Sequence, residues 1–155
     1  MRSPESARDV EARPTPGAGE HELKFTLPNS RASLARQWLE RLCRRDPAFP
    51  AAVVWTIYYD TSGLVSLAEK INSDYLKRKI RVRWYSDLEG RPAGPSFVEA
   101  KFRIGNRRFK VRVRLPYPAA DVSGWDLQDA RLQTLPSLLQ EHGIPTRDFW
   151  QPVVL

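Results

Sequence analysis

The feature that most constrains this chain is the stretch KRKIRVRWY, residues 77–85, because it alternates as a half-buried β-strand does. Successive side chains of a strand point to opposite faces. One face is mostly apolar and carries Arg78, Ile80, Val82 and Trp84. The other is uniformly positive and carries Lys77, Lys79, Arg81 and Arg83. Like charges repel at this spacing, so the stretch predicts a strand with one face on a core and the other facing an anion.

The same pattern returns twice further along the chain. FVEAKFR (97–103) and RFKVRVRL (108–115) are separated by the short turn 104–107, which predicts a β-hairpin. Their charged faces carry Glu99, Lys101 and Arg103, then Arg108, Lys110, Arg112 and Arg114. Between positions 77 and 114 there are 13 Lys or Arg against three acidic residues, so an ordinary solvated face, which mixes both signs, is the weaker explanation.

Composition supports an anionic partner. The chain has 155 residues, enough for one domain with a core, and a net charge of +7 with a pI near 9.9. Nucleic acid, a phosphorylated small molecule, a polyanion and a membrane surface all fit this charge. The lone Cys43 excludes a disulfide framework and a cysteine zinc site. No apolar run is long enough to span a membrane, and we predict a cytoplasmic protein.

The remaining segments predict an α+β fold. Residues 1–19 are rich in Pro, Gly, Ser and charge and predict a disordered tail before a domain over 20–155. Further strands are predicted at 20–27, at 52–61 and from 149 to the end, and a loop is predicted over 87–95. Helices are predicted at 31–45, 64–71 and 126–143, the last divided by Pro136. We expect them on the outer, apolar face of an antiparallel sheet.

Single residues in these segments carry more specific expectations. The helix over 31–45 has an apolar stripe of Leu34, Trp38 and Leu42, and we expect Trp38 and Trp84 in the core. Asp60 is expected to cap the helix that follows it.

Arginine outnumbers lysine on the charged faces, and its planar fork suits phosphate oxygens. Aromatic residues lie mainly on the apolar faces, which favours phosphate chains over stacked bases. No glycine-rich phosphate cradle is present, so side chains would hold the phosphates. Glu20, Glu22 and Glu99 share the faces of the cations. They are either partners in structural ion pairs or ligands of Mg²⁺ or Mn²⁺ that bridges to phosphate.

An ordered set of motifs resembles the VTC domain, the branch of the triphosphate tunnel metalloenzyme (CYTH-like) superfamily that includes polyphosphate polymerases. The set begins with the E-x-E-x-K pattern Glu20-His21-Glu22-Leu23-Lys24. It continues with YYDT (58–61), Leu64, Lys70, RKIRVRWY (78–85), FVEAKFR (97–103) and KVRVR (110–114). Each motif alone is weak, whereas the ordered set over residues 20–115 is specific.

The resemblance implies an antiparallel β-tunnel lined by Lys, Arg and Glu. Such a tunnel binds ATP or inorganic polyphosphate with a divalent metal, Mn²⁺ or Mg²⁺, and transfers the γ-phosphoryl of ATP to a growing phosphate chain without a covalent nucleophile. The implied phosphate ligands are Lys24, Lys79, Arg81, Arg83, Lys101, Lys110, Arg112 and Arg114. The implied metal or network carboxylates are Glu20, Glu22 and Glu99.

The resemblance also implies further strands that complete the tunnel. Since this chain ends at Leu155, it predicts a half or incomplete barrel that a partner chain would complete, or that is inactive as it stands. Alternatives are a CYTH-type triphosphatase and a non-catalytic module that binds polyphosphate or nucleic acid. No specific nucleic acid is expected.

Overall fold

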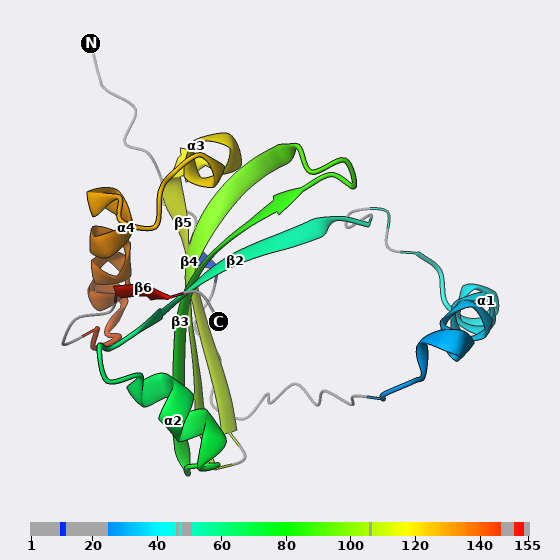
Figure 1. Ribbon diagram of the computed structural model, residues 1–155, viewed down its shortest axis with the longest axis horizontal. Coiled ribbons are helices and arrows are strands. Elements are labelled where there is room, and N and C mark those ends of the chain that lie inside the picture. The colour runs from blue at the N-terminus through cyan, green and yellow to red at the C-terminus, as the bar shows by residue number, and fades with distance from the viewer. Residues whose placement is uncertain are drawn as a thin grey trace.

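The chain forms an open, curved antiparallel sheet with helices on one face, as the computed structural model shows (Figure 1). The structure describes residues 10–11, 25–45, 47, 51–105, 107–146 and 151–153. Six strands are hydrogen-bonded in the order β1-β5-β4-β3-β2-β6, and no pairing among the described strands closes the sheet into a barrel. The α+β class is confirmed, and the open sheet is consistent with an incomplete barrel.

The three basic stretches are strands, as predicted, and they form the centre of the sheet. They are β3 (Leu76–Ser86), β4 (Pro92–Ile104) and β5 (Arg107–Pro118). β4 and β5 form the expected hairpin, paired without a break from Phe97↔Arg114 to Ile104↔Arg107. β3 pairs with β4 from Leu76↔Ile104 to Arg83↔Phe97. This continuous register fixes which charged side chains stand next to one another.

Shorter strands flank this centre. β2 (Val53–Asp60) lies beside β3 and confirms the strand predicted at 52–61. β6 (Gln151–Val153) pairs with the end of β2. β1 (Val10–Glu11) pairs with β5, so the described part of the 1–19 segment contributes a short strand.

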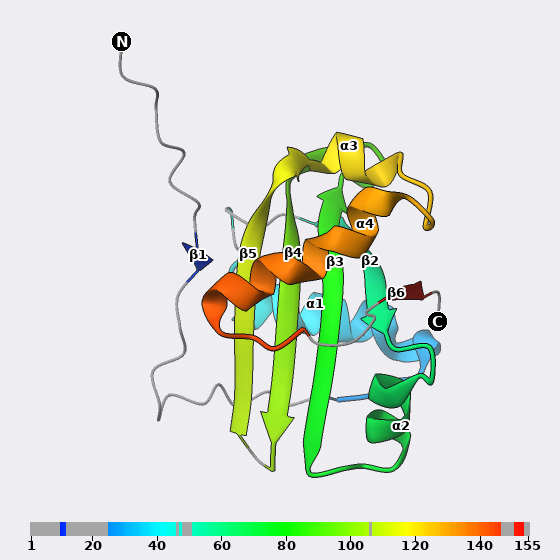
Figure 2. The ribbon, with the colours of Figure 1, turned by 90° about the vertical axis from the view of Figure 1, so that its left-hand side faces the viewer.

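The apolar faces of β2 to β5 pack against three short helices, of which one lies at the upper end of the sheet in Figure 2 and the other two cross the strands. These are α3 (Ala119–Ser123), α4 (Ala130–Thr134) and the 3-10 helix η2 (Leu135–His142). The core between them is made of Tyr59, Ile80, Val82, Trp84, Val98, Ala100, Val113, Leu115, Ala119, Val122, Leu132, Leu135 and Leu139. The hydroxyl of Tyr59 also donates to the carbonyl of Leu132 at 2.8 Å, which ties β2 to α4.

The predicted helix over 126–143 is divided at Pro136, as expected, into α4 and η2, and Gly143 ends it in the left-handed region (φ 75°). It begins at Ala130, later than predicted. α3 was missed, because five residues are too few to show a helical period in sequence.

The prediction of a loop over 87–95 was wrong at its end, since β4 already begins at Pro92. Pro92 stands at the first position of the strand, and Pro95 stands at an irregularity in the β4–β5 register. Prolines are tolerated at these two kinds of position because no ladder hydrogen bond is needed from their nitrogen. β5 likewise continues through Pro116 to Pro118.

Asp60, at the end of β2, caps the helix α2 (Val65–Ile71), as predicted. Its Oδ1 accepts from the amides of Thr61 (2.8 Å) and Ser66 (2.9 Å), and its Oδ2 accepts from the amide of Leu67 (3.0 Å). These last two amides lie in the first turn of α2, where no carbonyl is available to them. A buried carboxylate thus joins β2 to α2.

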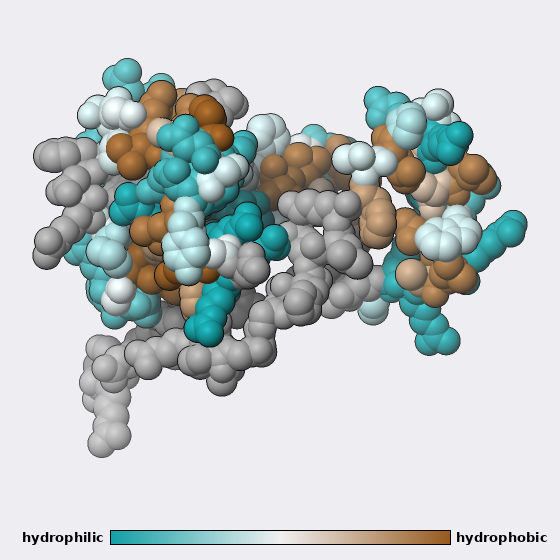
Figure 3. All heavy atoms as spheres, turned by 90° about the horizontal axis from the view of Figure 1, so that it is seen from below, coloured by the Kyte–Doolittle hydropathy of each residue, from teal (hydrophilic) through white to brown (hydrophobic). Residues whose placement is uncertain are grey.

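The first predicted helix stands apart from the sheet. It consists of the 3-10 turn η1 (Asn29–Arg31) and α1 (Ala32–Leu42), and among the described elements α1 contacts η1 and no strand. Figure 3 shows it as a separate lobe on which hydrophobic atoms are exposed. The expectation that Trp38 is buried was therefore wrong, because its side chain is 60% exposed. Among the described residues, none of the helices has the length and the apolar composition of a membrane span.

Part of the predicted N-terminal strand falls outside the described residues. Positions 20–24, with Glu20, Glu22 and Lys24, are not described, and neither is most of the predicted tail. The remaining positions, 25–27, are irregular rather than extended in a strand, with Phe25 83% exposed.

The Asp60 cap yields a stability prediction. We expect Asp60→Ala to lower the free energy of unfolding by about 2 kcal/mol, because it leaves buried amides of the first α2 turn without an acceptor. Asp60→Asn, which keeps one oxygen, should lose less. Urea unfolding measures the change, with Asp74→Ala, at an exposed position just after α2, as the control. Equal stability of Asp60→Ala and Asp74→Ala would contradict the capping role.

Candidate functional site

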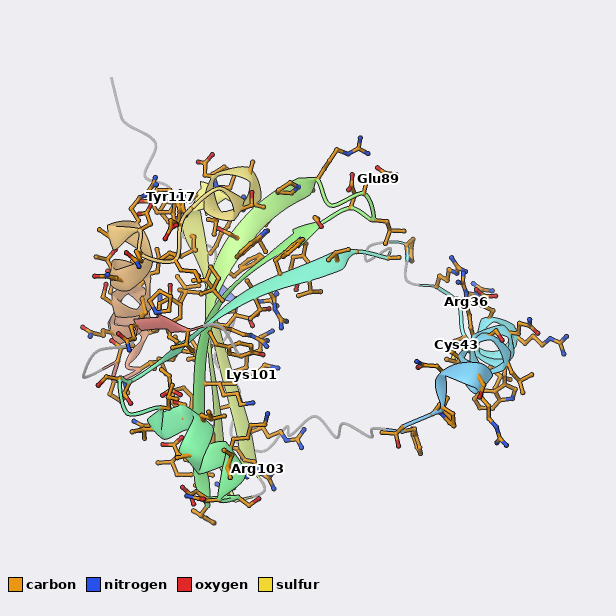
Figure 4. All side chains as sticks on the ribbon, viewed as in Figure 1. Arg36, Cys43, Glu89, Lys101, Arg103 and Tyr117 are labelled. Atoms are coloured by element: carbon orange, nitrogen blue, oxygen red, sulfur yellow. The ribbon has the colours of Figure 1, made fainter. Side chains whose placement is uncertain are left out.

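The strand register arranges the charged face of β3, β4 and β5 in four rows. The Arg83 row consists of Arg83, Phe97 and Arg114. The Glu99 row consists of Arg81, Glu99 and Arg112. The lysine row consists of Lys79, Lys101 and Lys110, and the outer row of Lys77, Arg103 and Arg108. We call the sheet face that bears these four rows the basic face. In Figure 4, Lys101 and Arg103 lie on the side of the sheet away from α4.

Glu99 is the one acidic residue in β3, β4 and β5, all of which the structure describes, and its side chain is fully buried. Its Oε2 accepts from Arg81 through Nε at 2.7 Å and Nη2 at 2.6 Å. Its Oε1 accepts from Arg112 through Nε and Nη2, both at 2.7 Å. Each carboxylate oxygen therefore accepts two hydrogen bonds from its own guanidinium group, and such charge-assisted bonds are stronger than those between neutral groups.

Two more cations stand close to the same carboxylate. Arg83 Nη1 lies 4.0 Å from Oε2, and Lys110 Nζ lies 3.7 Å from Oε1. The Nε of Arg83 is buried and has no hydrogen-bond partner among the described residues. One negative charge is thus shared by four cations, and the surroundings of Glu99 keep a positive excess.

The protonation state of Glu99 follows from this geometry. Burial alone raises the pKa of its carboxyl. The charges of Arg81 and Arg112 and the hydrogen bonds from both outweigh burial and hold the pKa below its ordinary value of 4.5. Glu99 is therefore an anion at neutral pH even though its side chain is fully buried.

The positive charge of the lysine row is balanced by fewer ion pairs than that of the Glu99 row. Within the part of the chain that the structure describes, Lys79 and Lys101 form no ion pair, and Lys110 reaches Glu99 only at 3.7 Å. Partial burial, followed by the charge of Arg81, lowers the pKa of Lys101 below 10.5. Burial and the neighbouring cations therefore both disfavour the charged form of Lys101, and a bound anion would favour it.

The Arg83 row holds the aromatic residue of this face. The guanidinium carbon of Arg112 lies 4.8 Å from the ring centroid of Phe97, within cation–π range. This contact, which the sequence did not predict, orients Arg112 from one side while Glu99 fixes it from another.

The structure brings eight of the eleven predicted site residues onto one surface: Lys79, Arg81, Arg83, Glu99, Lys101, Lys110, Arg112 and Arg114. Glu20, Glu22 and Lys24 lie outside the described residues. The outer row was not among the predicted ligands, although the same alternation places Lys77, Arg103 and Arg108 on this face.

The described residues do not fit a metal site. Among them no three His, Cys, Asp or Glu side chains come together as ligands of an ion. Glu99 itself has both oxygens occupied by guanidinium groups, so the ion-pair interpretation of this residue is the one that the geometry favours.

A sequence profile of the VTC domain family matches residues 20–133. This range includes all four rows of the basic face. No curated protein and no solved structure matches the chain significantly.

The Glu99 ion pairs predict an acid-dependent change in stability. At neutral pH we expect Glu99→Gln to lower the free energy of unfolding by about 3 kcal/mol, because the buried guanidinium group of Arg81 and the partly buried one of Arg112 lose their counter-charge. The folded pKa of Glu99 is below 4.5, so its stabilisation is complete above pH 4.5 and is lost as the pH falls through the folded value. The deficit of the variant should therefore shrink in acid.

Urea unfolding of both proteins from pH 7 down to pH 3 tests this. Glu89→Gln, at an exposed position of the loop before β4, is the control and should match the wild type closely. A Glu99→Gln deficit that stays constant over this range would contradict the ionised, arginine-bound carboxylate.

Proposed function

The chain belongs to the VTC domain family, and from this premise we propose that its basic face binds inorganic polyphosphate or the triphosphate of ATP. Family membership suggests a function related to polyphosphate polymerases. The proposal for this chain rests on its own residues.

The observation that supports the proposal most directly is the lysine row. Three lysines stand side by side on neighbouring strands, and like charges in register destabilise a sheet. The neighbouring carboxylate is already committed to two arginines, so it does little to relieve this repulsion. A bound polyanion would relieve it, which explains why an open face can retain this arrangement.

The Glu99 row has a different role in this proposal from Arg83 and the lysine row. Arg81 and Arg112 are oriented by Glu99 before any ligand arrives, which lowers the entropy lost on binding. Arg83, whose side chain is 20% exposed and reaches Glu99 only at 4.0 Å, and the lysine row are the groups that donate to phosphate oxygens. Arg114 lies beside them at the edge of the Arg83 row.

The finer proposal is phosphoryl transfer. A terminal oxygen of the phosphate chain would form a bond to the γ-phosphorus of ATP while the bond to the β–γ bridging oxygen breaks and ADP leaves. Such a reaction needs in-line positioning and neutralised charge more than it needs a covalent nucleophile. The basic face supplies neutralising charge.

The proposal also includes a divalent cation, whose candidate ligands lie outside the described residues. Mg²⁺ or Mn²⁺ binds carboxylate and phosphate oxygens together. Since Glu99 is occupied, Glu20 and Glu22 are the candidates for this role, and no step above depends on a metal.

A binding measurement tests the proposed function. We expect wild-type protein to bind inorganic tripolyphosphate in low-salt calorimetry. The double variant Lys79→Ala with Lys101→Ala should bind it about tenfold more weakly, because two charges with no described ion pair are removed. Rising salt should weaken both interactions.

Arg107→Ala is the matched control for this experiment. Arg107 is exposed and lies on β5, but it points to the opposite face from Arg108, so its removal changes the net charge without touching the basic face. If Arg107→Ala weakens binding as much as the double variant does, the attraction comes from overall charge and the proposed site is wrong.

A further inference from the structure

The basic face is longer than a triphosphate. Lys77, Lys79, Arg81 and Arg83 follow one another at every second position of β3, which spans about 20 Å at a rise of about 3.4 Å per residue. Across β3, β4 and β5 the face is only about 10 Å wide. The cations therefore form a ladder along the strands, and three linked phosphates would cover only part of it.

The outer row lies at one end of this ladder, beside the β4–β5 turn. Lys77, Arg103 and Arg108 face one another in register across the three strands. Arg103 and Arg108 are exposed, and Lys77 is partly buried. Within the described residues neither Lys77 nor Arg103 forms an ion pair. This end of the face therefore repeats the charge arrangement of the lysine row, about 7 Å further along the strands.

Arg103 is also held in place. Its Nε donates to the carbonyl of Gly105 at 2.8 Å, and its two Nη groups have no partner among the described residues. Gly105 has a φ of 57° in the tight turn after β4. The turn thus positions a guanidinium group whose remaining donors are available to an anion.

We propose that Lys77 and Arg103, with Arg108 beside them, form an outer subsite that binds a polyphosphate chain extending along the strands beyond the lysine row. The inference rests on the proposed function and deepens it, since it makes the length of the ligand matter. A triphosphate occupies the inner rows alone. A long chain contacts the outer row as well, and its affinity depends on residues that the triphosphate does not touch.

An ordinary solvated strand end would look different. Such a surface mixes acids with bases, whereas β3, β4 and β5 hold no acid other than Glu99, two rows away. On the opposite face, Glu69 of α2 binds Arg78, the sequence neighbour of Lys77, at 3.0 Å. The structure thus pairs the cation on the apolar face and leaves Lys77 without an ion pair among the described residues.

The test compares two probes, inorganic tripolyphosphate and size-fractionated long-chain polyphosphate. In the variant Lys77→Ala with Arg103→Ala, affinity for the long chain should fall about tenfold at low salt, and affinity for tripolyphosphate should change less than about twofold. For the long chain, removing each cation that binds a phosphate should also reduce the slope of log affinity against log salt by roughly 0.7.

Three controls accompany this comparison. Arg107→Ala removes a charge from the same hairpin end but from the opposite face, and should leave both affinities unchanged. Arg103→Lys keeps the charge and should keep most of the long-chain affinity. Lys77→Ala alone breaks no described side-chain hydrogen bond. If this variant also binds the long chain more weakly, the loss of affinity does not come from breaking the Arg103–Gly105 hydrogen bond. Urea unfolding checks that each variant is folded.

The outcomes separate the two proposals. Weaker binding confined to the long chain supports the outer subsite. If the double variant binds both probes as the wild type does, or binds both equally more weakly, the outer subsite is wrong while the inner site stands. If wild-type protein binds neither probe, the proposed function fails and the subsite fails with it.

Discussion

The structure of the basic face depends on one buried carboxylate. Glu99 sits at the middle strand of three, and it lets Arg81 and Arg112 approach each other from the two flanking strands. Without that charge, two guanidinium groups would share a buried space with no counter-ion, which costs several kcal/mol. With it, the strands can carry cations on either side of the Glu99 row. The carboxylate therefore makes the positive surface possible while leaving it short of negative charge.

The same strands build the core with their other face. Ile80, Val98 and Val113 alternate with the charged residues and pack against α3, α4 and η2. A shift of register by one residue would exchange the two faces, so the core and the basic face specify each other. The helices thus hold the register that brings Glu99 between its arginines. A change deep in the core should for this reason disturb the charged rows as well.

Much of the fold follows from the sequence. The period of two over 77–85, 97–103 and 108–115 predicts the central strands and the side chains on each face, and the position of Asp60 predicts its cap. The start of β4 was missed because a strand can tolerate residues that do not favour it. Pro92 and Pro95 suggested a loop, yet each occupies a strand position that needs no donor. α1 has an amphipathic pattern, but a pattern cannot say what its apolar side meets.

The sequence predicts which residues form the candidate site, but it does not predict which charges pair with one another. Alternation places the cations on one face, whereas the partner of each charge depends on the pairing register, which the sequence does not state. For this reason Glu99 could be a metal ligand or an ion-pair partner until the two guanidinium groups were located. The cation–π contact of Arg112 with Phe97 needs the same three-dimensional information. The roles of Lys24, Glu20 and Glu22 stay predictions.

Binding of polyphosphate at the lysine row can be tested directly by a footprint of lysine reactivity. Acetylation rates of individual lysines, measured by mass spectrometry with and without inorganic tripolyphosphate, report where the ligand lies. We expect the ligand to slow acetylation of Lys79, Lys101 and Lys110 several-fold, while Lys70, which is exposed on α2, reacts at an unchanged rate. Two results would contradict binding at the lysine row. One is slower acetylation of Lys70 without slower acetylation of the lysine row, and the other is that tripolyphosphate changes the rate of no lysine.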